Sequence, residues 1–261
     1  MQPDWDYVKN TTLWQYEELL KKLNTVMTYP VIWQAYNHTM PDAIAFYWRL
    51  FPQKTIETGE HHAQLRDTIL HFESAGISNW EDLLSRVVTR NDCMAFITTN
   101  KLEFEEFIDV LNYLLRWALP FPTASRELLD HENPQEMFHY EILKRYKIMK
   151  SFDILEHGHT LEGRRIIAEQ TDLPQGFVTS LVHRADIARL PYVRRKTLLP
   201  VCGAGYDTLA RIAAADLTQM ESDLDAYFRR TRGKPFENYR SVIVLNGMVA
   251  AAQALPVIME G

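Results

Sequence analysis

Histidine and carboxylate pairs are the residues of this 261-residue chain whose types and spacing come nearest to a reactive site. Glu136 and His139 stand three residues apart, as two metal ligands on one helix face do in di-iron bundles. Such bundles need a second motif of this kind and two further glutamates, which we do not find. His131-Glu132 precedes Asn133-Pro134 instead of a helical x-x-His, which excludes the zinc-protease signature. We therefore expect no metal site at these residues.

The other reactive residue types are equally isolated. His61-His62 follows Glu57, but adjacent histidines on a helix point in different directions, so we expect a solvated helix start. Cys93 and Cys202 lack a recognisable histidine partner, and we expect each to be a small core residue. The sequence contains no phosphate loop, no G-x-S-x-G and no dinucleotide fingerprint. We expect a protein without catalytic residues, metal or cofactor.

A basic cluster in the second half is the strongest candidate for a binding site. It consists of Arg184, Arg189, Arg194, Arg195 and Lys196. Such side chains can contact phosphates or an acidic protein surface. They can also form a solvated helix face whose charges balance Asp186 and the acidic first half. The whole chain carries a net charge of −6, so bulk charge predicts no general affinity for nucleic acid.

Helical periodicity dominates the elements that must position these residues. The spacing of apolar residues, prolines and caps predicts helices over 13–23, 31–40, 41–51, 61–73, 80–88, 103–119, 135–149 and 161–170. No comparable alternation predicts a strand, so we expect an all-α fold. Further helices are predicted after Pro174, with Leu181 and Val182 on the apolar face, through Leu198-Leu199 and over 209–215, and near the end of the chain within 242–259. The apolar faces of the predicted helices indicate that six leucines are buried, namely Leu83, Leu111, Leu114, Leu198, Leu209 and Leu245.

Two stretches of the first half return in the second half in the same order. Residues 68–70 and 75–77 (TIL and AGI) return as 197–199 and 204–206 (TLL and AGY). Later, Phe104-Glu105 and residues 118–120 return as Phe236-Glu237 and residues 254–256. We interpret this as an internal duplication. It predicts an N-terminal repeat over 1–120, an irregular connector with one helix over 121–160, and a C-terminal repeat over 161–261.

Short helices and turns alternate in the second repeat, with characteristic residues at Thr171–Leu173, Asp186–Pro191, Val193, Lys196, Leu198-Leu199, Ala204–Tyr206, Thr208-Leu209 and Ile212-Ala213. On these residues the second repeat resembles the helix-hairpin-helix superfamily. More closely, it is similar to a bacterial family of tandem helix-hairpin-helix repeats that has no assigned activity. The resemblance covers residues 161–256 and, through the internal repeat, more faintly residues 42–120. It implies a fold of two divergent helix-hairpin-helix repeats and is silent on function.

Departures from that pattern bear on phosphate binding. Helix-hairpin-helix modules that bind nucleic acid present the backbone of a glycine-rich hairpin to phosphate. Here Tyr192 and Arg194 occupy both hairpin glycine positions, and a β-carbon at either one obstructs that approach. The equivalent stretch of the first repeat, residues 52–59, contains no hairpin motif. Nucleic-acid binding by the second hairpin would therefore depend on side chains.

The first fifty residues are rich in aromatic side chains, namely Trp5, Trp14, Trp33, Tyr36, Phe46, Tyr47, Trp48 and Phe51. Three roles for these aromatic side chains remain open: packing between the repeats, a protein-binding or self-association surface, and a hydrophobic ligand pocket.

Near the other end of the chain, residues 242–259 carry no charge. Their polar residues and alanines favour a buried core helix over a membrane span.

These observations lead to one expected class of protein. Two distant cysteines and the lack of a basic and apolar leader predict a cytoplasmic protein without disulfides. We expect non-enzymatic macromolecule binding or scaffolding, with a protein partner or self-association and without a membrane. The alternative is sequence-independent nucleic-acid binding, principally to DNA, through the basic hairpin.

Overall fold

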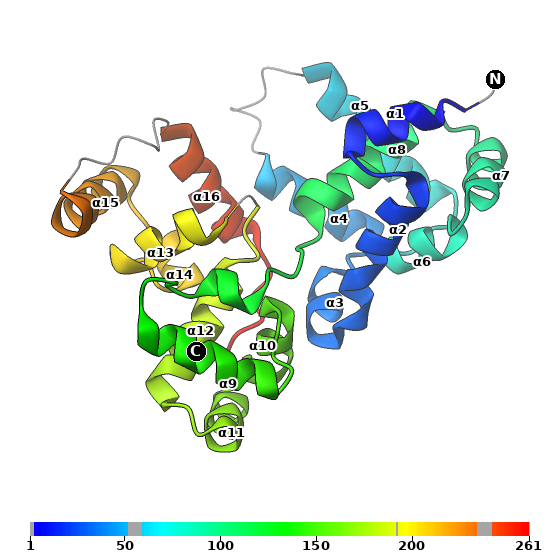
Figure 1. The fold of residues 1–261 in the computed structure, drawn as a ribbon. Coiled ribbons are helices and arrows are strands. Elements are labelled where there is room, and N and C mark those ends of the chain that lie inside the picture. The colour runs from blue at the N-terminus through cyan, green and yellow to red at the C-terminus, as the bar shows by residue number, and fades with distance from the viewer. Residues whose placement is uncertain (1–2, 52–58, 192, 234–241, 261) are drawn as a thin grey trace. The chain divides into compact units, whose positions relative to one another are not determined.

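The computed structural model describes residues 3–51, 59–191, 193–233 and 242–260 (Figure 1). Within these ranges the regular structure is helical and no strand is formed, which confirms the all-α class. All six leucines predicted to be buried are at most 9% exposed. The chain divides into two compact units, Met1–Pro120 and Phe121–Gly261, and each is described by itself below.

Unit 1 is built from α1 (Trp5–Thr12), α2 (Tyr16–Thr25), α3 (Pro30–Tyr36), α4 (Met40–Leu50), α5 (Gly59–Ser74), α6 (Trp80–Arg86), α7 (Arg90–Asn100) and α8 (Phe104–Tyr113). The short helical turns η1 (Val26–Thr28) and η3 (Leu114–Ala118) follow α2 and α8. Helix α8 packs on α5 and α1. Its residues Phe107, Ile108, Val110 and Leu111 are fully buried, so this helix forms much of the core of the unit.

The first predicted helix, over 13–23, begins too early. Leu13 has a φ of 71° and is 71% exposed, and it terminates α1. Helix α2 starts at Tyr16, where Gln15 and Glu18 form a reciprocal cap. Local capping therefore overrides the apolar spacing that placed Leu13 on the helix face. Helices α1 and α7 were not predicted from the sequence, and their side-chain caps are Asp4 and Thr89.

Aromatic side chains of the first fifty residues contribute to the core of unit 1. Tyr36, Phe46 and Tyr47 are at most 1% exposed. The ring of Tyr47 lies 5.4 Å from that of Tyr113 and 5.2 Å from that of Phe51. These separations are typical of packed aromatic pairs. The buried rings are thus accounted for by packing within this unit.

Unit 2 consists of α9 (Pro134–Arg145), α10 (Ser151–Gly158), α11 (Leu161–Thr171), α12 (Gln175–Ile187), α13 (Arg195–Gly203), α14 (Leu209–Ala213), α15 (Leu217–Arg232) and α16 (Val242–Ala254). A short turn, η4 (Ser125–Leu128), precedes them. The prediction of one helix in the segment 121–160 is wrong, because this segment contains α9 and α10. Both helices belong to the compact second unit, and η4 packs on α12 and α13.

Helix α12 is the central element of unit 2 and contacts α10, α11, η4, α13 and α14 (Figure 1). Asp172, with a φ of 55°, ends α11, and Pro174 precedes the first turn of α12. Val178, Leu181, Val182 and Ala185 are at most 2% exposed. Their spacing of three and four residues places them on one helix face. The opposite face of α12 is left for other contacts.

The two glycine turns of the proposed repeats have the same local geometry. Gly76 and Gly205 have φ values of 74° and 101°, conformations that a β-carbon disfavours. The N–H after each glycine donates to the carbonyl five residues earlier, from Ile77 to Phe72 and from Tyr206 to Val201. Packing around the turns differs, since α8 packs on α5 whereas α16 packs on α14 and α15. Phe236-Glu237 lies outside the described residues, and the duplication stays a prediction.

The uncharged segment near the end of the chain forms α16. Leu245, Met248, Val249, Ala251 and Ala252 are at most 7% exposed, so the prediction of a buried core helix is confirmed for these residues. In the described part of the chain, no helix is both long and apolar enough to cross a bilayer.

Candidate functional site

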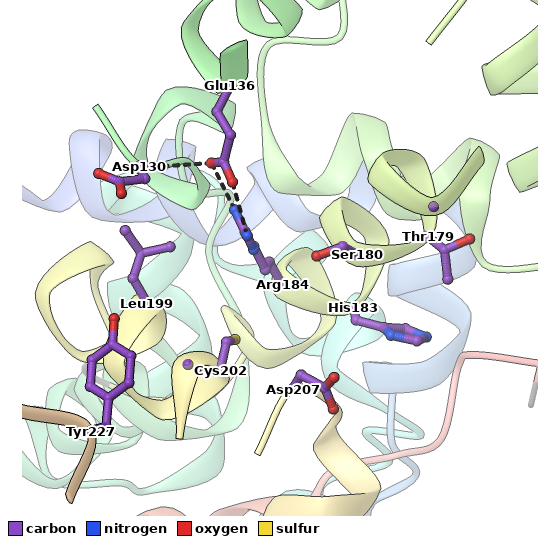
Figure 2. Close-up of a pocket in the computed structure, with 12 residues that line it drawn as sticks. Asp130, Glu136, Thr179, Ser180, His183, Arg184, Leu199, Cys202, Asp207 and Tyr227 are labelled. Atoms are coloured by element: carbon purple, nitrogen blue, oxygen red, sulfur yellow. Dashed lines mark hydrogen bonds and ion pairs between the residues drawn. The ribbon is translucent and has the colours of Figure 1, made fainter. Parts of the chain in front are cut away.

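A cleft of about 510 Å³ lies along the face of α12 that is opposite its buried stripe (Figure 2). This volume falls within the ~300–1,000 Å³ typical of ligand sites. Helix α12 contributes Gly176, Thr179, Ser180, His183 and Arg184, spaced by three and four residues. The other walls consist of Asp130, Glu136, Leu199, Cys202, Gly203, Asp207 and Tyr227. We call this the α12 cleft.

One end of the α12 cleft is formed by an ion pair between Arg184 and Glu136. Nη1 and Nη2 of Arg184 donate to the two carboxylate oxygens at 2.9 and 3.1 Å, as the dashed lines of Figure 2 show. Nη1 also donates to the carbonyl of Leu128 at 3.1 Å. The two side chains are 18% and 14% exposed. Such a bidentate, largely desolvated pair connects α12 to α9 and fixes the orientation of Arg184.

Local sequence explains why Glu136 points at Arg184. Asn133 caps α9 by accepting from the N–H groups of Gln135 and Glu136, so Glu136 lies in the first helical turn. The N–H of Asp130 donates to the carboxylate of Glu136 at 2.7 Å. The Nε–H of Arg184 remains buried without a hydrogen-bond partner among the described residues. A buried donor of this kind costs free energy unless a partner satisfies it.

Three further polar side chains of α12 face the cleft, those of Thr179, Ser180 and His183 (Figure 2). Burial lowers the pKa of His183, and the positive charge of Arg164 lowers it further. The imidazole is therefore neutral near pH 7 and offers one donor and one acceptor. Together with the two hydroxyl groups it presents a row of hydrogen-bonding groups spaced along one helix face.

The thiol of Cys202 does not provide a nucleophile in this cleft. Burial raises the pKa of Cys202 to about 11, so that its thiolate is scarce near neutral pH. Cys202 is half-buried and lines the cleft, which corrects the expectation of a core residue; Cys93 is fully buried as expected. Beside Cys202, Gly203 lies against Tyr227, where an added β-carbon would be 2.2 Å from the ring.

The five basic residues proposed from the sequence do not form one surface. Arg184 faces the α12 cleft. Arg189 is 3% exposed, because its guanidinium bonds to Asp186 at 2.5 Å and to the carbonyl of Pro256 at 3.0 Å. Asp186 is itself 6% exposed. The expectation that Arg189 contacts a partner is corrected: it is a buried structural residue that links α12 to the segment after α16.

The remaining three basic residues lie at the start of α13. Arg194 is exposed and precedes the first turn, and its Nη1 donates to the carbonyl of Val193 at 2.7 Å. Arg195 lies 3.7 Å from the carboxylate of Glu127 in η4. Lys196 is exposed on the first turn. Tyr192, the other departure from the hairpin pattern, lies outside the described residues.

The metal candidates are separated or otherwise engaged. Glu136 binds Arg184, and His139 is 7% exposed with its ring 4.3 Å from that of Phe177. Glu57 lies outside the described residues. Across the ranges that the structure describes, no three histidine, cysteine or acidic side chains gather as metal ligands would.

Sequence reasoning missed most of the α12 cleft. The apolar face of α12 was predicted from Leu181 and Val182, whereas the opposite face was not predicted to line a cleft. Small and polar residues recur there at helical spacing, from Gly176 through Thr179 and Ser180 to His183. That stripe was the available signal. The approach of Asp130 and Glu136 was not readable, because it depends on tertiary packing.

In comparisons with known proteins, no protein-family model, curated protein or solved structure matches this chain.

Proposed function

We propose that this protein is a non-enzymatic macromolecule-binding or scaffolding protein whose second unit takes a polypeptide partner in the α12 cleft. One observation carries the proposal. The cleft presents unengaged hydrogen-bonding groups, namely the side chains of Thr179, Ser180 and His183. The thiol beside them is held protonated. These groups suit recognition of a polar chain better than covalent chemistry.

The charge of the cleft favours a polypeptide over a nucleic acid. Asp130, Glu136 and Asp207 line it against the single guanidinium of Arg184, which is already paired with Glu136. Asp207 is paired with Arg211 at 2.7 Å on the rim. A phosphate backbone would meet more carboxylates than free cations here. A peptide backbone supplies both donors and acceptors, as the hydroxyl groups and the neutral imidazole require.

Binding can be tested with a peptide selected on the purified full chain from a displayed random library, followed by calorimetry. Thr179→Val removes a hydroxyl at nearly constant shape and should weaken binding about 5- to 10-fold, the worth of one hydrogen bond. Ser180→Trp should fill the cleft and abolish binding. Ser222→Trp, on an exposed site of α15 outside the cleft, is the matched control and should bind normally. Equal binding by Ser180→Trp and the native chain would refute the site.

A second candidate function is nucleic-acid binding at the start of α13, and one observation favours it. No acidic residue lies in the first turn of α13, and Arg194 and Lys196 are exposed there. A helix N-terminus and nearby cations attract anions. The pairing of Arg195 with Glu127 and the burial of Arg189 weaken this candidate.

Fluorescence polarisation with duplex and single-stranded DNA over a salt series tests this second candidate. Salt-sensitive binding that Arg194→Ala and Lys196→Ala together reduce, with a slope smaller by about one per lost contact, would establish it. Absence of binding at ~50 mM salt, where phosphate contacts are strongest, would eliminate this second candidate.

The divergent helix-hairpin-helix duplication is likewise a proposal, supported by the matching turns at Gly76 and Gly205.

A further inference from the structure

Helix α9 has two distinct faces. Its inward face carries Glu136, which binds Arg184, and the buried residues His139 and Leu143. Its outward face carries Phe138 and Ile142, and Tyr146 continues the same row just beyond the helix end. Phe138 and Tyr146 are 64% and 51% exposed, and Ile142 between them is half-buried. Residues spaced by four lie on one side of a helix, so these three side chains form one apolar row on the surface.

Other apolar side chains are exposed beyond the end of α9, and Met149 is 37% exposed. Tyr146 also lines a hollow of about 660 Å³, which is lined as well by Ile166 of α11, 39% exposed. Scattered exposed hydrophobic residues are ordinary on a monomer, but a contiguous row beside a hollow is typical of an interaction surface. We call Phe138, Ile142 and Tyr146 the α9 row.

Charge along the α9 row changes sign from one end to the other. Glu132 is exposed just before the helix, whereas Arg145 and Lys147 are exposed at its end. An antiparallel pairing of two identical helices brings the acidic end of each beside the basic end of the other. It also aligns the two helix dipoles favourably. In a two-fold arrangement centred on α9, Phe138 of one copy faces Ile142 of the other, and Glu132 lies near Lys147.

We propose that the α9 row is a self-association surface, and that two copies of this chain pair their α9 helices antiparallel about a two-fold axis. Two-fold contacts are the commonest in homo-oligomers, and they require a self-complementary surface. The α9 row meets that requirement in both its apolar residues and its charges. This inference goes beyond the proposed function, because it uses the face of α9 that points away from Glu136 and the α12 cleft.

The dimer should be weak. A contact made by one helix and the residues beside its end is smaller than the ~1,200–2,000 Å² of a stable interface. We expect dissociation on the order of 10–100 µM, so that the full chain is monomeric when dilute and dimeric when concentrated. Sedimentation velocity over a concentration series measures this equilibrium directly.

Substitution in the apolar row provides the first arm of the test. Phe138→Glu should raise the dissociation constant at least tenfold, and because Phe138 is exposed the chain should still fold. Val257→Glu is the matched control, since Val257 is 88% exposed and outside the row, and it should leave the equilibrium unchanged. A native chain that stays monomeric at all concentrations, or a dimer that Phe138→Glu leaves intact, overturns the proposal.

Charge reversal provides the second arm and tests the antiparallel geometry. Glu132→Lys alone and Lys147→Glu alone should each weaken the dimer several-fold, because like charges then meet across the axis. The double variant, which exchanges both signs in every chain, should recover most of the native affinity. Weakening without recovery in the double variant contradicts the antiparallel pairing. Recovery in the double variant would show that each single variant lost affinity because like charges met, and not because the chain misfolded locally.

Discussion

The ion pair between Arg184 and Glu136 allows the packing of unit 2 to be tested quantitatively. Arg184→Ala removes two hydrogen bonds to Glu136 and one to the carbonyl of Leu128. It leaves the carboxylate of Glu136, 14% exposed, without its counter-charge. Breaking a buried pair on one side costs ~3–5 kcal/mol. Because both side chains keep slight solvent exposure, we expect the lower end, about 3 kcal/mol.

The assay uses the distribution of tryptophan. All six tryptophans lie between residues 5 and 117, so their fluorescence reports on unit 1, whereas circular dichroism at the helical minimum reports on both units. With a urea slope of about 2 kcal/mol per molar, the substitution should move the dichroism transition of unit 2 by about 1.5 M. The fluorescence transition should not move if the two compact units unfold separately.

Two comparison variants sharpen this prediction. Glu136→Gln keeps an acceptor for Arg184 and for the N–H of Asp130, so it should cost about half as much. Arg165→Ala removes an exposed pair with Glu162 on α11 and should leave both transitions in place. An unmoved dichroism transition in Arg184→Ala would refute the reasoning about the pair. Equal shifts in both signals would show that the units unfold as one.

Four further predictions concern residues of the α12 cleft. Gly203→Ala should destabilise unit 2 by about 1–3 kcal/mol in urea unfolding, because its β-carbon displaces Tyr227. Gly176→Ala, which adds a β-carbon into open space, should be neutral or stabilising by ~0.5 kcal/mol. Cys202 should react with a thiol reagent at pH 8 on the order of 100-fold more slowly in the native chain than in urea, owing to its pKa of about 11. The pKa of His183 is lowered in the folded state, so the unfolded chain takes up its proton first as pH falls. Its contribution to stability should therefore be present above pH 6.5 and be lost as pH falls through the lowered pKa, and His183→Gln should flatten that loss in urea titrations.

Helical periodicity in the sequence was enough to predict the fold class and the burial of six leucines. It was enough because a stripe of apolar residues must be covered wherever it occurs. Helix ends were less readable. Leu13 carries the right spacing for α2, yet the reciprocal cap of Gln15 and Glu18 starts that helix later. Helix α10 was overlooked, although Phe152, Ile154 and Leu155 are at most 1% exposed.

The candidate site was predictable only in part. Arg184 was selected for its charge, and it does line the α12 cleft. Arg189 was selected for the same reason and is buried, because Asp186 and the carbonyl of Pro256 satisfy its guanidinium. A sequence shows how much charge a segment carries, but the partner of each charge depends on tertiary packing. Glu136 reaches Arg184 from a helix that the sequence analysis treated as part of a connector.

Amide chemical shifts of the labelled full chain, recorded while the selected peptide is added, test the central claim most directly. If the α12 cleft is the binding site, the largest shifts will fall on Thr179, Ser180 and His183 and on the facing end of α13 around Cys202. Largest shifts at Arg194 and Lys196, or within Met1–Pro120, would contradict it.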